Sequence, residues 1–374
     1  MENFPSNITV RPQTSGKSGL TGKEGLVSNQ SAGSTSISDS RSRSWLAPHR
    51  IVLIVLWLVT AVTFVTMLWQ DVRHTSRFSV ARYTLHAGYV VALLWYLSRS
   101  GPSISQLPEL RPLAFPRWRY GPWIPVLGIA LMLALTAISD DGADILMLLM
   151  IVATVWIIVA WRREIGLRSV IQGVMVAAIA FAAGLPMMKN GFISETALYF
   201  LSILATPMYI AGGLLINRTG LGGIQLLAKR YLPALRSFLW GCLLFVPLGL
   251  ANAAGGSPGS NVTWVSEWWM PFSLPWFSGI AEETWFRLLL VGLCYLMLRP
   301  AFSKCPALAV LAAVLFSGIT FGLGHGRTLE RFLTTGLIYG VPMAVIFARR
   351  DWEHAVGAHY MVNMIPWVMA FLET

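Results

Sequence analysis

The sequence is poor in charge and in cysteine. Only 12% of its 374 residues are Asp, Glu, Lys or Arg, about half the share of an ordinary soluble domain. In contrast, 55% are hydrophobic and the mean hydropathy is +0.61. The three cysteines, Cys242, Cys294 and Cys305, fit no metal-binding spacing and no disulfide framework. This composition argues against a soluble domain and predicts a membrane protein that crosses the bilayer many times.

The net charge of +11 does not indicate nucleic-acid binding. The basic residues form no single patch and lie in short groups between apolar runs, as the positive-inside rule expects. From the fourth apolar run to the tenth, a basic group follows every second run. We therefore expect a multi-pass protein of the cell membrane with the N-terminus in the cytoplasm. Arg73 and Arg77 break the alternation.

Apolar runs of roughly the length that spans a bilayer follow one another along most of the chain. They predict an all-α transmembrane bundle of about eleven spans, near residues 51–69, 80–97, 123–138, 143–161, 169–185, 196–216, 238–254, 271–298, 307–324, 332–348 and 352–372.

Two polar stretches divide the predicted chain. Residues 1–44 are rich in Ser, Thr, Gly and Asn and cannot bury a core, so we expect a disordered tail. A Gly-, Pro- and Ser-containing loop near residue 255 then separates a group of helices, 45–255, from a final domain, 265–374. The sequence assigns no role to the first group, and the loop ends in a Trp-rich stretch that we expect to lie along the membrane surface.

One apolar run carries charges at its centre. The run 271–298 contains Glu282, Glu283 and Arg287, each of which costs about 2.5–3.5 kcal/mol at the middle of a bilayer. Glu283 and Arg287 are four residues apart, so on a helix they share one face and can pair. Glu282 points elsewhere. We therefore expect Glu282 to face a polar cavity, where a carboxylate can act as a general base on water.

Two further motifs follow on later apolar runs. Phe321 and His325 are four residues apart, as are His359 and Asn363, so each pair shares a helix face. Hydrolysis of a peptide bond needs a base for water and donors for the developing oxyanion. Glu282 suits the first role, His325 can help to hold the water, and His359 and Asn363 can donate to the oxyanion.

Helix packing sets a condition on this hypothesis. Upright helices would leave His325 and His359 at different depths, because His359 lies only about seven residues into the last run, at 1.5 Å of rise per residue. Tilt, a broken helix or a later start must bring the two histidines together. Small residues at Gly318, Gly322, Gly336 and Gly340 fit close helix packing, so the sequence predicts direct backbone contact there.

Each feature alone has a simpler structural explanation. Glu283 with Arg287 is typical of a structural ion pair, and His359 with Asn363 of a hydrogen bond between helices. Paired charge inside a helix is also what proton-coupled transport uses. A non-proteolytic transporter, or a peptide-binding or immunity protein with the same polar cavity, is therefore the alternative function.

Taken in order, the three motifs resemble those of the CPBP family of intramembrane proteases, which includes CAAX prenyl endopeptidases of the Rce1 type and Abi domains. The family pattern is Glu-Glu-x-x-x-Arg, then Phe-x-x-x-His, then His-x-x-x-Asn or a similar residue, and every position is filled here. The resemblance covers the last third of the chain. It implies an intramembrane endopeptidase that cleaves a membrane-associated protein or peptide, with CAAX-type processing by analogy. The catalytic residues it implies are Glu282, His325, His359 and Asn363, supported by Glu283, Arg287 and Phe321.

Metal dependence is open within that family. Members have been described both as metalloproteases and as metal-independent glutamate proteases, and this sequence lacks His-Glu-x-x-His. Glu282, His325 and His359 could hold zinc with an open fourth position. Asn363 and Arg287 fit an oxyanion site better than a ligand shell, so we favour no cofactor.

Overall fold

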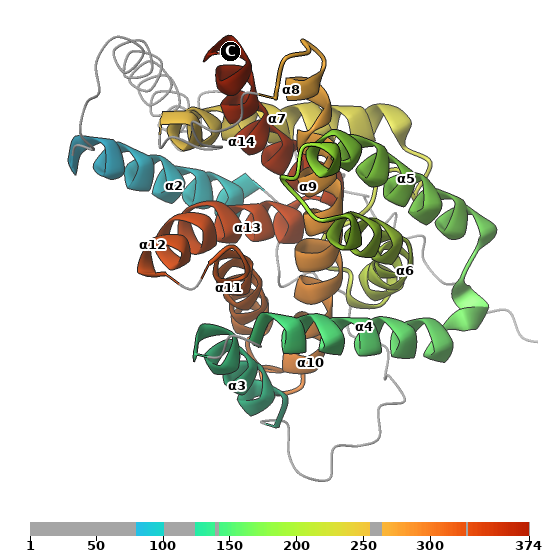
Figure 1. Ribbon diagram of the computed structural model, residues 1–374. Helices are drawn as coiled ribbons and strands as arrows, with labels where there is room; N and C mark the ends of the chain where they lie inside the picture. The colour runs from blue at the N-terminus through green and yellow to red at the C-terminus, as the bar shows by residue number, and fades with distance from the viewer. Residues whose placement is uncertain (1–79, 101–123, 139–141, 255–263, 327, 374) are drawn as a thin grey trace, which may run out of the picture. The chain divides into compact units, whose positions relative to one another are not determined.

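The structure is a computed structural model that describes residues 80–100, 124–138, 142–254, 264–326 and 328–373 (Figure 1). Every element in these ranges is a helix. In chain order they are α2 (Val80–Ser100), α3 (Ile124–Ile138), α4 (Gly142–Ala160), η2 (Arg162–Glu164), α5 (Leu167–Lys189), α6 (Glu195–Thr219), α7 (Tyr231–Ala254), α8 (Met270–Ser273), α9 (Pro275–Glu282), η3 (Glu283–Val291), α10 (Gly292–Leu298), α11 (Pro306–Gly324), α12 (Leu329–Arg331), η4 (Phe332–Gly340), α13 (Val341–Arg349) and α14 (Trp352–Glu373).

The expected all-α, multi-pass architecture is confirmed, and the expected number of spans only in part. Within the described ranges, six helices are long and apolar enough to cross a membrane, namely Leu167–Lys189, Glu195–Thr219, Tyr231–Ala254, Pro306–Gly324, Phe332–Arg349 and Trp352–Leu372. α3 and α4 contain shorter apolar stretches, and the run 271–298 is divided among four consecutive short elements and carries three charges. The predicted span 51–69 and the predicted tail 1–44 lie outside the described residues.

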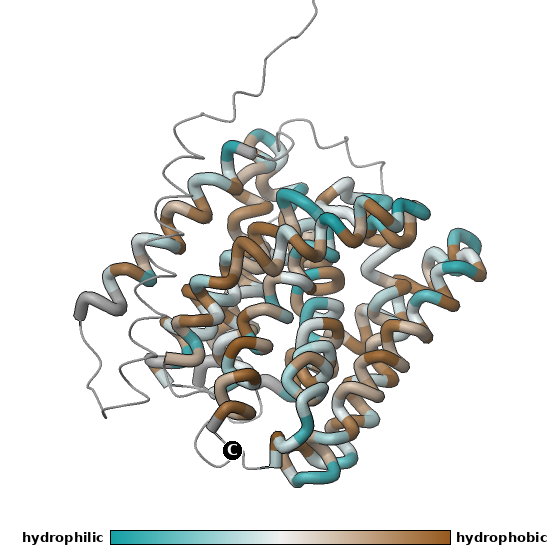
Figure 2. The backbone as a smooth tube through the Cα atoms, turned by 90° about the horizontal axis from the view of Figure 1, so that it is seen from above, coloured by the Kyte–Doolittle hydropathy of each residue, from teal (hydrophilic) through white to brown (hydrophobic). Residues whose placement is uncertain are grey.

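Local sequence signals explain where the helices begin and end. Ser194 caps α6 by accepting a hydrogen bond from the Ala197 amide at 3.1 Å, and Gly220 ends it in the left-handed conformation with φ of 66°. Figure 2 shows hydrophobic residues along the helices and hydrophilic residues mainly towards their ends. This pattern is typical of helices whose apolar surface faces lipid or other helices.

The elements α8, α9, η3 and α10 follow one another without a loop and form the central column of Figure 1. Helices α5, α6, α11, α13 and α14 all pack against parts of this column. Its middle, η3, is a π-helix of nine residues. Such wider turns are rare and are frequently found at functional sites. The column therefore places the charged residues of the run 271–298 among other helices.

Two helix pairs approach until their backbones touch. In α7 and α14, a Cβ added at Gly241 or Gly357 would lie 2.1 Å from a carbonyl oxygen of the other helix. In α11 and η4, a Cβ at Gly322 would lie 2.5 Å from the Cα of Gly336. The contact between α11 and η4 was predicted from the small residues Gly318, Gly322, Gly336 and Gly340, and it is confirmed.

The last helix begins inside the protein. Asp351, Trp352 and Glu353 are all buried, and the segment between α6 and α7 covers them. The Trp352 amide donates to the Gly223 carbonyl at 2.8 Å, and Glu353 accepts from the amide of Leu226 at 2.8 Å. This start inside the protein places His359, two turns into α14, level with the acidic pair.

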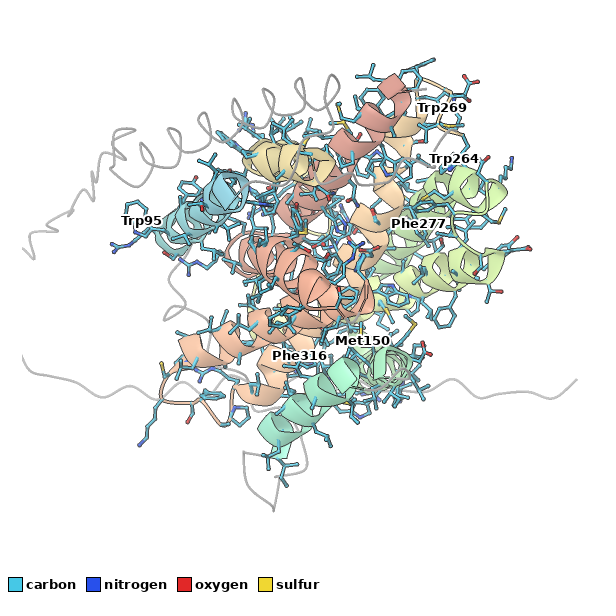
Figure 3. The ribbon with its side chains drawn as sticks, turned by 60° about the vertical axis from the view of Figure 1, so that its left-hand side comes forward. Trp95, Met150, Trp264, Trp269, Phe277 and Phe316 are labelled. Carbon is cyan, nitrogen blue, oxygen red and sulfur yellow. The ribbon has the colours of Figure 1, made fainter. Side chains whose placement is uncertain are left out.

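Aromatic residues gather next to α8. Figure 3 shows Trp264 and Trp269 near each other at one end of the helices. The ring of Trp264 packs 5.6 Å from Trp367 of α14 and 6.2 Å from Phe192. Trp268 and Trp269 are exposed, which fits the headgroup level of a bilayer. That this Trp-rich stretch lies along the membrane surface stays a prediction.

Candidate active site

The two glutamates flank the change from α-helix to π-helix. Glu282 is the last residue of α9 and Glu283 the first of η3. Glu283 and Arg287 are both 0% exposed, with Arg287 Nε 3.2 Å from Glu283 Oε2. The predicted ion pair is therefore present, and burial makes each partner depend on the other. The side chain of Glu282 is 22% exposed and points to different partners.

Arg287 has contacts beyond Glu283 that satisfy its buried charge. Its Nη1 donates to the Ser317 hydroxyl at 3.2 Å, and that hydroxyl donates to the Phe286 carbonyl at 2.7 Å. The guanidinium lies 4.6 Å from the ring centre of Phe321. A desolvated cation over an aromatic ring is stabilised by about 2 kcal/mol. Phe321 therefore supports the charged pair, in line with the role that the motif predicts.

The two histidines are each fixed through Nδ1. His359 Nδ1 is 2.8 Å from Glu283 Oε1, and His325 Nδ1 is 2.9 Å from the carbonyl oxygen of Phe321. A carbonyl oxygen and an ionised carboxylate only accept hydrogen bonds. Each Nδ1 therefore carries the hydrogen, and in the neutral imidazole each Nε2 presents a lone pair.

Both Nε2 atoms face the same carboxylate oxygen. Glu282 Oε2 lies 3.7 Å from Nε2 of His325 and 3.7 Å from Nε2 of His359. This is too long for a direct hydrogen bond, so the three atoms are brought together without being bonded to one another. The oxygen is buried and makes no hydrogen bond to any residue that the structure describes. Three acceptor atoms thus lie together, and a water held there can donate hydrogen bonds to two of them.

The ring of Phe321 also holds both imidazoles. It lies 4.6 Å from the His325 ring in a tilted arrangement and 5.6 Å from the His359 ring, edge to face. Aromatic contacts of this kind restrict ring rotation. One side chain thus contacts Arg287 and the two histidines together.

Asn363 lies one turn beyond His359 and makes a contact that the motifs do not predict. Its Nδ2 donates to the Ser278 hydroxyl at 2.7 Å. Ser278 and Ser317 are the polar residues that the sequence analysis missed. The one available signal was spacing, because Ser278 precedes Glu282 by four residues and therefore shares its helix face.

The residues able to bind a metal ion are few in the described part of the site. In the described part of the chain, no group of three or more His, Cys, Asp or Glu residues is arranged to hold a metal ion. Glu282, His325 and His359, the residues named above as possible zinc ligands, come together, with Glu282 Oε2 3.7 Å from Nε2 of each histidine.

Comparison with known proteins gives one match. Residues 264–365 fit the family model described as Type II CAAX prenyl endopeptidase Rce1-like, and this range contains all the predicted site residues. No curated protein matches the chain, and no solved structure does. The match confirms the resemblance that the three motifs predict, because residues 264–365 are similar to the Rce1-like CAAX prenyl endopeptidases.

Proposed function

We propose that this protein is an intramembrane endopeptidase in which Glu282 activates water to hydrolyse a peptide bond in a membrane-associated protein or peptide. The observation that carries the proposal is the position of Glu282 Oε2, 3.7 Å from Nε2 of both His325 and His359. A water there has two acceptors for its two hydrogens, Glu282 and one imidazole. Its lone pair is then free to attack a carbonyl carbon.

The remaining groups complete the reaction. Glu282 takes one proton from the attacking water, while Nε2 of His325 orients the water. The carbonyl oxygen becomes an oxyanion and accepts hydrogen bonds from Asn363 Nδ2 and from Nε2 of a protonated His359. In that form of His359, the Glu283 carboxylate on Nδ1 faces the positive charge. When the C–N bond breaks, Glu282 returns its proton to the leaving amine.

Two properties of the proposed reaction extend the family match. The substrate is a protein with a prenylated cysteine near its C-terminus, by analogy with the CAAX prenyl endopeptidases of the matched model. The hydrolysis is independent of metal, because the donors already needed for water and oxyanion are supplied by side chains.

The test is cleavage of quenched fluorescent peptides, with and without a farnesylated CAAX terminus, by the full chain in liposomes. We expect Glu282→Gln to lower kcat by roughly 10²- to 10⁴-fold, the usual contribution of a general base. Glu267→Gln is the matched control, because it removes an exposed carboxylate just before α8. A chelator should leave cleavage unchanged.

Other outcomes would change the proposal. Cleavage that survives Glu282→Gln would refute Glu282 as the base. Chelator sensitivity reversed by zinc would make Glu282, His325 and His359 metal ligands. Peptide binding without cleavage by a well-folded wild type would support the alternative, a non-proteolytic transporter or peptide-binding protein, which the family match does not favour.

A further inference from the structure

We infer that Ser278 is a positioning residue that sets the orientation of the Asn363 carboxamide in the active site. This inference rests on the proposed function, because it concerns the donor that Asn363 offers to the oxyanion. Ser278 belongs to none of the three motifs, yet it lies in α9 one turn before Glu282. It contacts Asn363 of α14, which lies one turn beyond His359.

The contact between Ser278 and Asn363 lies about one helical turn from the contact between Glu283 and His359, and it joins the same two segments. At one level, His359 Nδ1 is 2.8 Å from Glu283 Oε1. At the next level, Asn363 Nδ2 donates to Ser278 Oγ at 2.7 Å. These two side-chain hydrogen bonds link the α9–η3 segment to α14, and each involves a residue assigned to the oxyanion.

Close backbone packing keeps the two levels in register. A Cβ added at Gly279, next to Ser278, would lie 3.5 Å from both the Tyr360 amide nitrogen and the Val356 carbonyl oxygen of α14. The helices therefore meet near this glycine, between the two linked levels. A short side chain such as serine spans the remaining gap, and the 2.7 Å contact follows from that approach.

The hydroxyl hydrogen of Ser278 determines which end of the amide faces α9. Ser278 Oγ donates to the Pro275 carbonyl oxygen, 3.4 Å away in the preceding turn. The hydroxyl oxygen offers a lone pair to Asn363, whose amide presents its NH₂ group to it. One hydrogen of Nδ2 is used in this bond, and the second stays available to an oxyanion.

A donor that is already oriented is worth more than one that must reorient during the reaction. Without Ser278 the amide of Asn363 can rotate, and its oxygen can turn towards the oxyanion, which it would repel. The loss should appear in kcat rather than in KM, because the oxyanion does not exist in the bound substrate.

The experiment is a double-mutant cycle on cleavage in liposomes. We expect Asn363→Ala to lower kcat by about 10²- to 10³-fold, and Ser278→Ala to lower it by about 10- to 100-fold with KM unchanged. Adding Ser278→Ala to Asn363→Ala should have no further effect. Ser278→Thr keeps the hydroxyl and should restore kcat to nearly the wild-type value.

Ser273→Ala is the matched control. Ser273 is half-buried, and its hydroxyl donates to the Met270 carbonyl at 3.2 Å, three residues back, as that of Ser278 does to Pro275. It should leave kcat unchanged. Glu282-dependent cleavage in which Ser278→Ala behaves like Ser273→Ala, or in which the effects of Ser278→Ala and Asn363→Ala multiply, would overturn the inference. Cleavage that does not depend on Glu282 would instead refute the proposed function, and this inference would fall with it.

Discussion

The chain contains two buried carboxylate–histidine pairs that look alike locally and differ in what surrounds them. Asp351 Oδ1 is 2.7 Å from His354 Nδ1, and Glu283 Oε1 is 2.8 Å from His359 Nδ1. In the first pair, Asp351 lies just before α14 and His354 in its first turn; in the second, His359 lies five residues further along α14 and faces Glu283 of η3. Both carboxylates are almost fully buried. Distance alone therefore does not separate a structural pair from a candidate catalytic one.

The difference lies in how many acceptor positions remain open. Asp351 accepts four hydrogen bonds, two at each oxygen, from the ring and amide of His354 and from the side chains of Ser237 and Gln225. A carboxylate with four partners has no open position. The Glu283–His359 pair instead directs Nε2 of its histidine at Glu282 Oε2, which has no hydrogen-bonded partner among the described residues. A carboxylate that takes a proton from water needs such an open position, whereas a carboxylate that only stabilises the fold does not.

Removing Glu283 should have the largest effect on stability. Glu283→Gln leaves the buried Arg287 without its counter-ion, which costs about 3–5 kcal/mol. We expect a marked fall in the temperature of thermal unfolding in detergent, together with loss of cleavage. The double variant Glu283→Gln/Arg287→Met should recover much of the stability and none of the cleavage. A wild-type unfolding temperature for Glu283→Gln alone would contradict the importance of the pair.

Removing the charge of Asp351 should affect stability only. Asp351→Asn weakens hydrogen bonds to a charged group, which are worth about 1.5–3 kcal/mol. Cleavage per folded molecule should stay at the wild-type level, since this carboxylate has no open acceptor. Asp144→Asn, at an exposed aspartate in the first turn of α4, is the control. If folded Asp351→Asn lost cleavage, the distinction between the two pairs would be wrong.

Low pH should destabilise the folded protein in part by protonating Asp351. Burial alone would raise the pKa of Asp351, but hydrogen bonds from His354 and Ser237 hold it below the ordinary value of 3.8. A lowered pKa in the folded state gives stability that is fully present above 3.8 and is lost as the pH falls through the lower folded value. The unfolding temperature of the wild type should therefore fall more steeply below about pH 4 than that of Asp351→Asn. Parallel curves for the two proteins would contradict this.

The smallest effect is expected at the glycine contact that positions His325. Gly322→Ala places a Cβ 2.5 Å from the Cα of Gly336, and such overpacking costs about 1–3 kcal/mol. Gly324→Ala in the same helix meets nothing within 4 Å and serves as the control. We expect a lower unfolding temperature only for Gly322→Ala, measured in the same detergent. Equal effects would mean that the contact is not tight.

Much of this molecule follows from local sequence patterns. Each of the predicted apolar runs from residue 80 onwards coincides with a helix or a series of helices. The pairing of Glu283 with Arg287 and the backbone contacts of Gly322 also follow, because both depend on spacing along one helix. Six of the described helices are long and apolar enough to cross a membrane, and the total of about eleven spans stays a prediction, because apolar composition does not separate a full span from a shorter helix.

The arrangement around Glu282 could not be predicted in the same way. The sequence supplies a carboxylate, two imidazoles and an amide, but not which nitrogen of each histidine carries the hydrogen. For His325 it is decided by the Phe321 carbonyl one turn back in the same helix, and for His359 by Glu283, which lies 76 residues earlier in the chain. The depth of His359 depends on a loop more than 120 residues earlier, which buries the start of α14.

The sequence by itself therefore determined the helices, the buried charges and the residues able to activate water and bind an oxyanion. Apolar length and helical spacing are local properties, and they survive without knowledge of the fold. Only the tertiary structure decided that Glu282 Oε2 has two Nε2 atoms at 3.7 Å, and that Ser278 contacts Asn363. Those facts depend on how helices cross and how deep each one begins, which is set by packing between segments far apart in the chain.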